Sequence, residues 1–244
     1  MSPDINDEIE WDALPGLFPA FESPGRWLPL LQRHLALVEE AAPQTRVTSV
    51  PASEAVRRHY AECLELLRVA SRPGPPASVV DVGSGGGYPG LVIAAVMPGA
   101  PVTLIEPLKK RARLLEAMAA ELGLVNVRVD ALRAEEAGRG AARDSGDLVT
   151  ARAVAPLAEL LEYTAPLARV GGAVVLAKGS GLADELGRSA RAQDELRCAL
   201  ETIEKARPAI SPNLAFALFR KLDPTPAKYP RRPGFPGKRP LQNG

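Results

Sequence analysis

Hydrophobic and polar positions alternate through the middle of the chain as they do in a sheet with helices between its strands. Short apolar runs, rich in valine and alanine, are separated by longer amphipathic segments. The apolar runs predict strands at 78–83, 101–106, 125–130, 147–152, 172–178, 199–206 and 214–222. The amphipathic segments predict helices at 89–97, 108–122, 156–168 and 181–197, with a short helix or loop over 131–142.

Strands that alternate with helices predict an α/β fold with a mostly parallel, seven-stranded sheet and helices on both faces. The last two strands, 199–206 and 214–222, follow each other without a helix between them. We therefore predict that they form a hairpin, which adds one antiparallel strand to the sheet.

An N-terminal helical region, residues 23–72, precedes this sheet domain. Helical patterns run near 26–42 and 53–70, and the breaker Arg72-Pro-Gly-Pro-Pro76 follows them. The sheet domain itself is predicted to span 76–222.

The two ends differ sharply in charge. Residues 1–22 hold six acids and no base, whereas residues 223–244 hold five bases, one acid and six prolines. Both are predicted to be poorly ordered, the first an acidic tail and the second a basic, proline-rich tail. Arg231 and Arg232 lie among aromatic residues in the basic tail, a mixture that suits either RNA phosphates and bases or a plain solvated end.

The turn after the first predicted strand carries the strongest functional signal. It contains Gly83, Gly85, Gly86 and Gly87, and Pro89 then suits the first turn of a helix. Glycine adopts backbone angles that other residues avoid, and it lets a ligand lie against bare peptide. A strand, a bare turn and a helix start predict a nucleotide-type pocket at the carboxyl edge of a parallel sheet.

The spacing of these glycines indicates which nucleotide. A dinucleotide fingerprint starting at Gly83 fails, because its sixth position is Tyr88. The frame Gly85, Gly87 and Gly90 fits the letters but begins too far beyond the strand, so a nicotinamide oxidoreductase is kept only as an alternative. The pattern typical of S-adenosylmethionine methyltransferases, Asp-x-Gly-x-Gly-x-Gly, fits Asp81, Gly83, Gly85 and Gly87.

Glu106 ends the next predicted strand, twenty-five positions after Asp81. A carboxylate at that point can accept hydrogen bonds from both ribose hydroxyls of a nucleotide cofactor. We therefore expect Glu106 to bind the cofactor ribose.

Composition limits the remaining classes. The chain has 244 residues, 46% of them apolar, and a net charge of +1. It has no apolar run of membrane-spanning length and no signal-peptide pattern, so we expect a cytoplasmic protein without membrane contact. Cys63 and Cys198 are isolated and there are two histidines, a set that predicts no metal site.

Several cations are predicted to lie near the carboxyl edge. Lys109, Lys110, Arg111 and Arg113 open the helix that follows Glu106, which hints at a polyanion partner or a solvated helix face. Arg152 and Lys178 end the fourth and fifth strands. Each would contact an anionic ligand there or form an internal ion pair.

Together these motifs resemble the RsmG (GidB) family, the bacterial methyltransferases that modify 16S ribosomal RNA. The resemblance covers about residues 45–241 in order. Its motifs are Asp81–Gly90, Glu106-x-x-Lys-Lys-Arg111, Arg133-Ala-Glu-Glu136, Thr150-Ala-Arg-Ala-Val-Ala-Pro-Leu157, Lys178-Gly179 and Tyr229-Pro-Arg-Arg-Pro-Gly-x-Pro236.

The resemblance implies a Rossmann-like class I fold, S-adenosylmethionine as methyl donor, and N7 of a guanine in the decoding-region loop of 16S rRNA as acceptor. The expected partner is thus 16S rRNA or the small ribosomal subunit. By the same resemblance, Gly83 and Tyr88 line the methionine side of the cofactor, and Ala134 and Glu135 meet its adenine. Arg152 lies at the cofactor or substrate edge, and Lys110, Arg111 and Lys178 hold RNA phosphates.

The N-terminal part departs from the family pattern. Residues 42–49 keep only the threonine-serine end of an expected motif, and Glu62-Cys63 stands where an aspartate-serine pair is usual. This leaves open a divergent member that methylates another RNA or a small molecule, and also a non-catalytic RNA-binding protein. Methylation at guanine N7 needs no general base, so the motifs single out no catalytic residue.

Overall fold

In the computed structural model, which describes residues 9–45, 47–152 and 155–243, seven strands form one sheet in the order β3-β2-β1-β4-β5-β7-β6. Their bounds are β1 (Val79–Val82), β2 (Val102–Ile105), β3 (Val127–Asp130), β4 (Gly146–Arg152), β5 (Ala168–Lys178), β6 (Cys198–Lys205) and β7 (Ala215–Lys221). β1 to β5 pair in parallel, and β7 runs antiparallel to both β5 and β6. The α/β fold and the final hairpin are confirmed.

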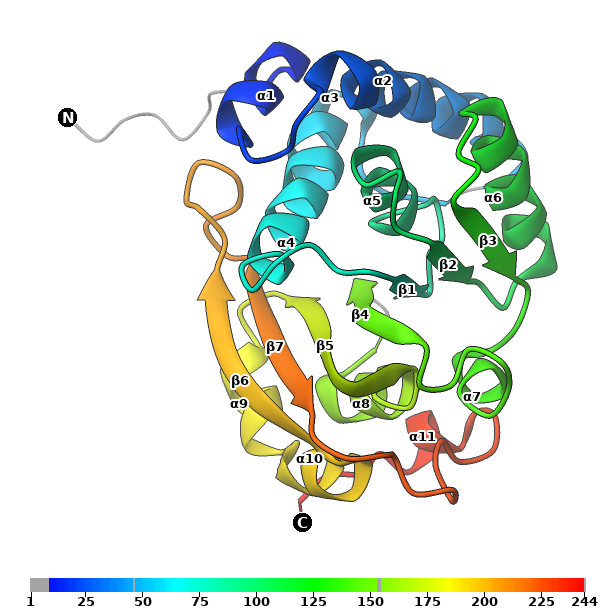
Figure 1. Ribbon diagram of the computed structural model, residues 1–244, viewed down its shortest axis with the longest axis vertical. Coiled ribbons are helices and arrows are strands. Elements are labelled where there is room, and N and C mark those ends of the chain that lie inside the picture. The colour runs from blue at the N-terminus through cyan, green and yellow to red at the C-terminus, as the bar shows by residue number, and fades with distance from the viewer. Residues whose placement is uncertain (1–8, 46, 153–154, 244) are drawn as a thin grey trace.

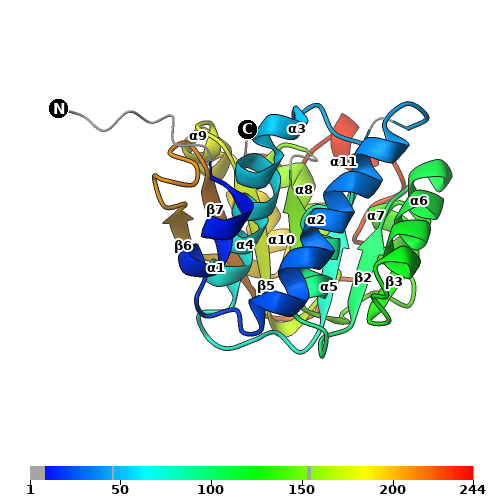
Figure 2. The same ribbon diagram turned by 90° about the horizontal axis from the view of Figure 1, so that it is seen from above.

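Helices cover both faces of the sheet (Figure 1). One face carries α2 (Pro24–Ala41), α4 (Glu62–Ala70), α5 (Gly90–Val96) and α6 (Lys109–Glu121). The other carries α7 (Ala134–Ala137), α8 (Leu157–Thr164), α9 (Leu182–Gly187), α10 (Ala190–Leu196) and α11 (Phe235–Lys238). Figure 2 shows α2 outermost on the first face, where it packs on α5 and α6.

Strand alternation explains why there are two cores. Successive side chains of a strand point to opposite faces, so Val79 and Leu104 pack under the N-terminal helices while Val80, Val82 and Ile105 pack against α8. All five are almost fully buried. The N-terminal helices share the first core with the sheet, so they are a continuous part of the domain.

Two predicted helices are interrupted. The segment predicted as one helix over 53–70 consists of α3 (Ala52–Ala55), a π-helical turn (Val56–Ala61) and α4. A π turn inserts one extra residue per turn, which rotates the side chains that follow and is frequent at functional sites. The segment 181–197 divides into α9 and α10, where the buried Ser189 donates its hydroxyl to the Leu186 carbonyl.

The prediction of a disordered N-terminal tail is wrong for residues 9–22. A 3-10 turn (Trp11–Ala13) and α1 (Leu14–Leu17) form there. The side chains of Leu14 and Phe18 are buried in the first core. Glu10 and Asp12 obscured this pattern in the sequence, because both are exposed beside a short apolar stripe. The rest of the predicted tail, residues 1–8, lies outside the described residues.

The prediction of a disordered basic tail is also wrong. Residues 223–243, here called the C-terminal strap, follow the second helix layer and bury Tyr229 and Leu241. Arg231 donates to Glu162, a carboxylate with no solvent exposure, at 2.8 Å from Nε and 2.5 Å from Nη2. The backbone N–H of Arg231 also donates to Glu162, at 2.7 Å.

No helix in the described ranges is long and apolar enough to cross a membrane.

We predict that Glu162→Gln destabilises the protein by about 3 kcal/mol, because the partly buried Arg231 guanidinium loses its charged, fully buried partner. Urea unfolding would measure the free energy. Glu54→Gln is the matched control, since it breaks the exposed pair Glu54–Arg58 and should cost under about 1 kcal/mol. Equal losses in the two variants would contradict the buried role of Glu162.

Candidate active site

The glycine turn adopts the conformation that its composition predicts. Gly83, Gly85 and Gly87 have φ angles of +73°, +55° and +90°. Residues with a Cβ rarely adopt such angles, so each of these positions favours glycine. The turn directly follows β1. Because β2 lies on one side of β1 and β4 on the other, the strand order reverses here, and this is the switch point of the sheet.

Asp81 supports this turn from below. Its carboxylate has no solvent exposure and accepts hydrogen bonds from the Gly90 N–H at 3.2 Å and the Thr150 hydroxyl at 2.9 Å. Burial raises its pKa to about 6. The methyltransferase pattern in the sequence includes Asp81 among the residues expected to bind the cofactor, but its side chain is buried away from the cavity surface. Its position inside β1 turns its side chain toward α5, and its role is to hold the helix start.

Gly90 is also a packing position. A Cβ there would lie 2.9 Å from the Asp81 carboxylate and would collide with Leu104. Gly90 therefore faces the core rather than a ligand, which removes the basis of the dinucleotide frame Gly85, Gly87 and Gly90.

Glu106 lies beside the turn, at the carboxyl end of β2. Its two carboxylate oxygens accept from the N–H groups of Gly85 and Leu108, each at 3.0 Å. The side chain is 3% exposed. Each carboxylate oxygen accepts more than one hydrogen bond, so Glu106 retains capacity for a ribose hydroxyl while it holds the turn.

Four rings form a cluster on the far side of the turn. His34 of α2 lies 2.9 Å from the Gly86 carbonyl through Nε2 and 3.1 Å from the Tyr60 hydroxyl through Nδ1. Since a carbonyl only accepts, Nε2 carries the proton and Nδ1 accepts from Tyr60. The Tyr60 and Tyr88 hydroxyls are 3.2 Å apart, and the Tyr88 ring stacks on His59 at 4.2 Å.

A cavity of about 220 Å³ opens beside the turn, at the carboxyl ends of β1 and β2. Gly83, Ala134 and Glu135, for which the resemblance implies contact with the cofactor, line it together with Arg133. Glu135 also accepts the Gly234 N–H at 2.7 Å, so the C-terminal strap supports this wall. Tyr88 does not line this cavity.

A second cavity of about 310 Å³ lies farther along the same edge, between β4, β5 and the N-terminal helices. Arg152 and Lys178 line it, together with Arg58 and Glu62. The pairing of Arg152 with Ala177 in the β4–β5 register brings the two strand-end cations together. Arg152 therefore belongs to this cavity and not to the first.

Lys178 forms an internal ion pair, which is one of the two roles expected for it from the sequence. Its Nζ lies 2.7 Å from Glu185 and 3.0 Å from the Ala155 carbonyl, and the side chain is 11% exposed. Arg231 is likewise held internally, by Glu162. Both cations are charge-balanced by a neighbouring acid, so neither presents a free positive group to RNA.

The other predicted RNA contacts lie nearer the surface. Lys110 is exposed on α6 and donates to the Gln44 carbonyl at 2.5 Å, and Arg111 follows it on the same helix. Arg232 is exposed on the C-terminal strap. It lies 5.4 Å from the Phe235 ring centroid, with Arg239 on the same ring at 6.0 Å.

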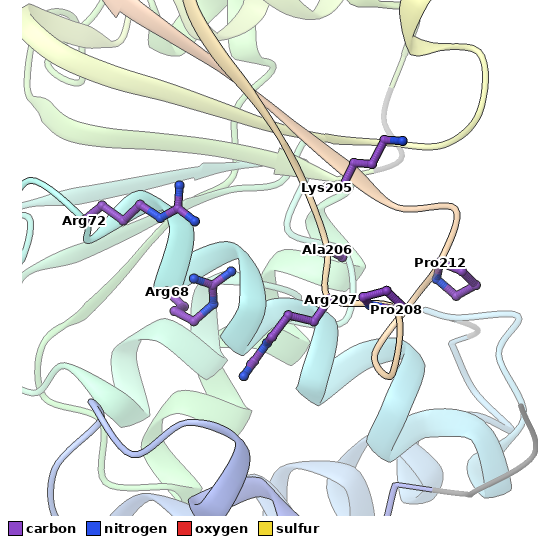
Figure 3. A pocket seen from close by; sticks show the side chains of 7 residues that line it. All are labelled: Arg68, Arg72, Lys205, Ala206, Arg207, Pro208 and Pro212. Atoms are coloured by element: carbon purple, nitrogen blue, oxygen red, sulfur yellow. The ribbon is translucent and has the colours of Figure 1, made fainter. Parts of the chain in front are cut away.

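A further cavity of about 630 Å³, outside this edge, is rich in arginine but does not form a comparable site (Figure 3). Arg68 and Arg207 both pair with the buried Glu65, at 2.8 Å. Arg72 pairs with Glu204. These side chains tie α4 to the strand β6 and the segment after it, so their charges are already used within the fold.

Comparison with known proteins places this arrangement in a family. A family model described as rRNA small subunit methyltransferase G (GidB) matches residues 28–209. The ribosomal RNA small subunit methyltransferase G of Carboxydothermus hydrogenoformans is 36% identical over 215 residues, which are 87% of this chain and 91% of the relative. That of Roseiflexus sp. (strain RS-1) is 41% identical over 189 residues, 76% and 79% of the two chains. This chain belongs to that family.

Family membership confirms the resemblance seen in the sequence, the enzyme class of methyltransferase and the cofactor S-adenosylmethionine. Solved structures agree on the fold. Cofactor-bound Rv0187 from MTB has a TM-score of 0.54 at 21% identity, covering 79% of this chain and 89% of that one. A geranyl diphosphate methyltransferase in complex with GPP and sinefungin has a TM-score of 0.51 at 15% identity, covering 66% and 77%.

The residues fit the cofactor of this family. Gly83 presents bare peptide to the first cavity at a positive φ, and the Glu106 carboxylate lies beside the same turn. The sequence pattern did not reveal the ring cluster above the turn. The segment 53–70 showed only helical spacing, and no local signal places His34 against a glycine 52 positions away.

We predict that His34 makes stability depend on pH. Burial lowers its pKa to about 4 from an unfolded value near 6.5. Between these values the unfolded chain binds a proton that the folded protein does not, so stability falls as pH falls through this window. The loss for one such group is about 3 kcal/mol.

The pKa values of His59 and Asp81 are also shifted, so they add to the pH dependence of stability. The effect of His34 is therefore measured as a difference between two proteins. Free energies of unfolding would be compared for the wild type and His34→Gln, whose amide preserves one donor and one acceptor. The free energy of unfolding of the wild type should exceed that of His34→Gln at pH 6.5, and this difference should become smaller as the pH falls to 4. A difference that stays constant over this range would rule out the neutral, buried state of His34.

Proposed function

We propose that this protein transfers a methyl group from S-adenosylmethionine to N7 of a guanine in the decoding-region loop of 16S rRNA. The observation that carries the proposal is the glycine turn at the sheet switch point, opening onto a cavity within a chain that matches the family over residues 28–209. The curated relatives are named ribosomal RNA small subunit methyltransferase G, which supports the substrate class.

The residues that would hold the cofactor lie around the first cavity. Gly83 supplies bare peptide, Glu106 a carboxylate for the ribose, and Ala134 with Glu135 the wall for the adenine. Asp81 supports the glycine turn that would contact the cofactor. The second cavity, which Arg152 lines, is the place for the acceptor base.

Little acid–base chemistry is needed for this reaction. When bound, the cofactor supplies an electrophilic methyl group on a sulfonium sulfur, and the lone pair of guanine N7 takes it up without losing a proton. The protein therefore acts mainly by aligning the two reactants, which contributes up to about 7–11 kcal/mol to such reactions. The acceptor guanine has to be unstacked or already exposed to reach the cavity.

Two groups of cations at or near the surface suit an RNA strand that approaches this edge. Lys110 and Arg111 lie at the start of α6, directly after the loop that follows Glu106. Arg232 and Arg239 lie against Phe235 on the C-terminal strap, where the ring offers a stacking surface. Lys178 and Arg231, two further predicted phosphate ligands, are held in internal ion pairs and are left out of this surface.

We predict that Gly83→Asp abolishes measurable S-adenosylmethionine binding in calorimetry, because it places a side chain and a charge in the first cavity. Gly123→Asp is the control. Gly123 also has a positive φ, +63°, but a Cβ there meets nothing within 4 Å. Unchanged affinity in Gly83→Asp would refute the assigned cavity, while equal loss in both variants would point to general strain.

We predict that Arg232→Ala weakens RNA binding uniformly across sequences and reduces the slope of log K against log salt by roughly 1. Arg169→Ala is the control, because Arg169 lies on β5 at the opposite, amino edge of the sheet. Titrations of 16S rRNA at several salt concentrations would measure both slopes. Equal slopes for Arg232→Ala and wild type would mean that Arg232 does not contact RNA phosphates.

Mapping of 7-methylguanine in rRNA from cells with and without the gene tests the whole proposal. A site that loses its methyl group without the gene is the expected result. If methylation of 16S rRNA is the same in both, the acceptor is another molecule or the protein binds RNA without transferring a methyl group.

A further inference from the structure

The second cavity contains a carboxylate and a guanidinium that face each other without a close hydrogen bond. Glu62 and Arg152 are 3.5 Å apart at their nearest atoms, and their side chains are 14% and 16% exposed. Elsewhere in the described structure, buried acids hold arginines much more tightly, as Glu162 holds Arg231 at 2.5 Å. The loose pair therefore has hydrogen-bonding capacity left on both partners.

Arg152 is held in place by its other nitrogen. Nη2 lies 2.5 Å from Nδ1 of His59, whose Nε2 lies 2.7 Å from the Thr48 hydroxyl. Burial and the adjacent Arg152 charge lower the pKa of His59 to about 3, so the ring stays neutral and accepts from Arg152. Among the described residues, Nη1 lies 3.5 Å from Glu62 and 3.7 Å from the Cys63 sulfur.

Glu62 is positioned by the interruption in the N-terminal helices. It is the first residue of α4, directly after the π-helical turn, and it also receives a hydrogen bond from Ser211. Burial raises its pKa, and Arg152 only partly offsets this effect. Each carboxylate oxygen can accept more than one hydrogen bond, so Glu62 can bind a hydrogen-bond donor of a ligand in addition to Ser211 and Arg152.

A guanine base has the complementary edge. On its Watson–Crick side, N1–H and the N2 amino group are adjacent donors, and O6 is an acceptor beside them. A carboxylate accepts two parallel hydrogen bonds from such a pair of donors, and a guanidinium donates to the oxygen. Adenine carries an unprotonated N1 at the same place, which would meet the carboxylate with a lone pair.

We propose, resting on the function proposed above, that Glu62 is the residue that selects guanine, accepting from N1–H and N2 while Arg152 donates to O6. This arrangement leaves N7, on the adjacent Hoogsteen edge of the base, free for methylation. It also has a consequence for rate. Methylation at N7 gives the base a positive charge, and a carboxylate on N1–H stabilises that charge as it develops.

The test uses small subunits reconstituted with 16S rRNA that carries either guanine or inosine at the mapped acceptor position. Inosine lacks only the N2 amino group. For the wild type, kcat/KM for guanine should exceed that for inosine about 10- to 100-fold, the usual effect of a hydrogen bond to a charged group. For Glu62→Gln, activity on guanine should fall at least 10-fold and the ratio should approach 1.

Two controls separate selection from a merely structural role. Calorimetry should give the same S-adenosylmethionine affinity for Glu62→Gln as for wild type, and Glu201→Gln, an exposed acid on β6, should keep the full guanine preference. Glu62→Asp should retain part of the preference, because it keeps the charge.

A guanine-to-inosine ratio that is unchanged in Glu62→Gln would overturn the inference. Loss of cofactor affinity in step with activity would also overturn it. Failure of the proposed function gives a different result from failure of this inference. In that case the wild type itself would transfer no methyl group to N7 of the guanine-containing subunit.

Discussion

The site depends on a backbone turn that is held in left-handed conformations by buried side chains from three directions. Asp81 holds the helix start below it, Glu106 accepts the Gly85 N–H beside it, and His34 donates to the Gly86 carbonyl from the far side. Polar side chains in such surroundings are costly unless they are paired. Each of these three is paired with the turn or the helix it leads into, so the pairing offsets the cost of burial and holds the turn in this conformation.

The N-terminal helices belong to the site because they supply one of these supports. His34 comes from α2, and Tyr60 and His59 come from the π-helical turn that leads into α4. Their rings pack against Tyr88 of the glycine turn, and His59 fixes Arg152 at the end of β4. One cluster thus connects the cofactor turn with the cavity assigned to the acceptor base.

The C-terminal strap plays the corresponding part on the other face. Glu162 and Glu135 take hydrogen bonds from the strap, and Glu135 lines the first cavity. The cations of the C-terminal strap therefore fall into two groups, those paired within the fold and those at the surface. Arg231 is used within the fold, whereas Arg232 stays at the surface beside Phe235. The same division applies at the sheet edge, where Lys178 pairs internally with Glu185.

The sequence by itself determined the strand order along the chain, the closing hairpin, the glycine turn and the family. These rest on local signals, since periodicity, positive-φ glycines and short motifs involve neighbouring residues. Only the tertiary structure decided which charged groups are free, because a cation becomes neutralised by an acid that is distant in sequence, as Arg231 is by Glu162 over 69 positions. For the same reason, only the fold brings Glu62 and His59 to Arg152, about 90 positions away along the chain.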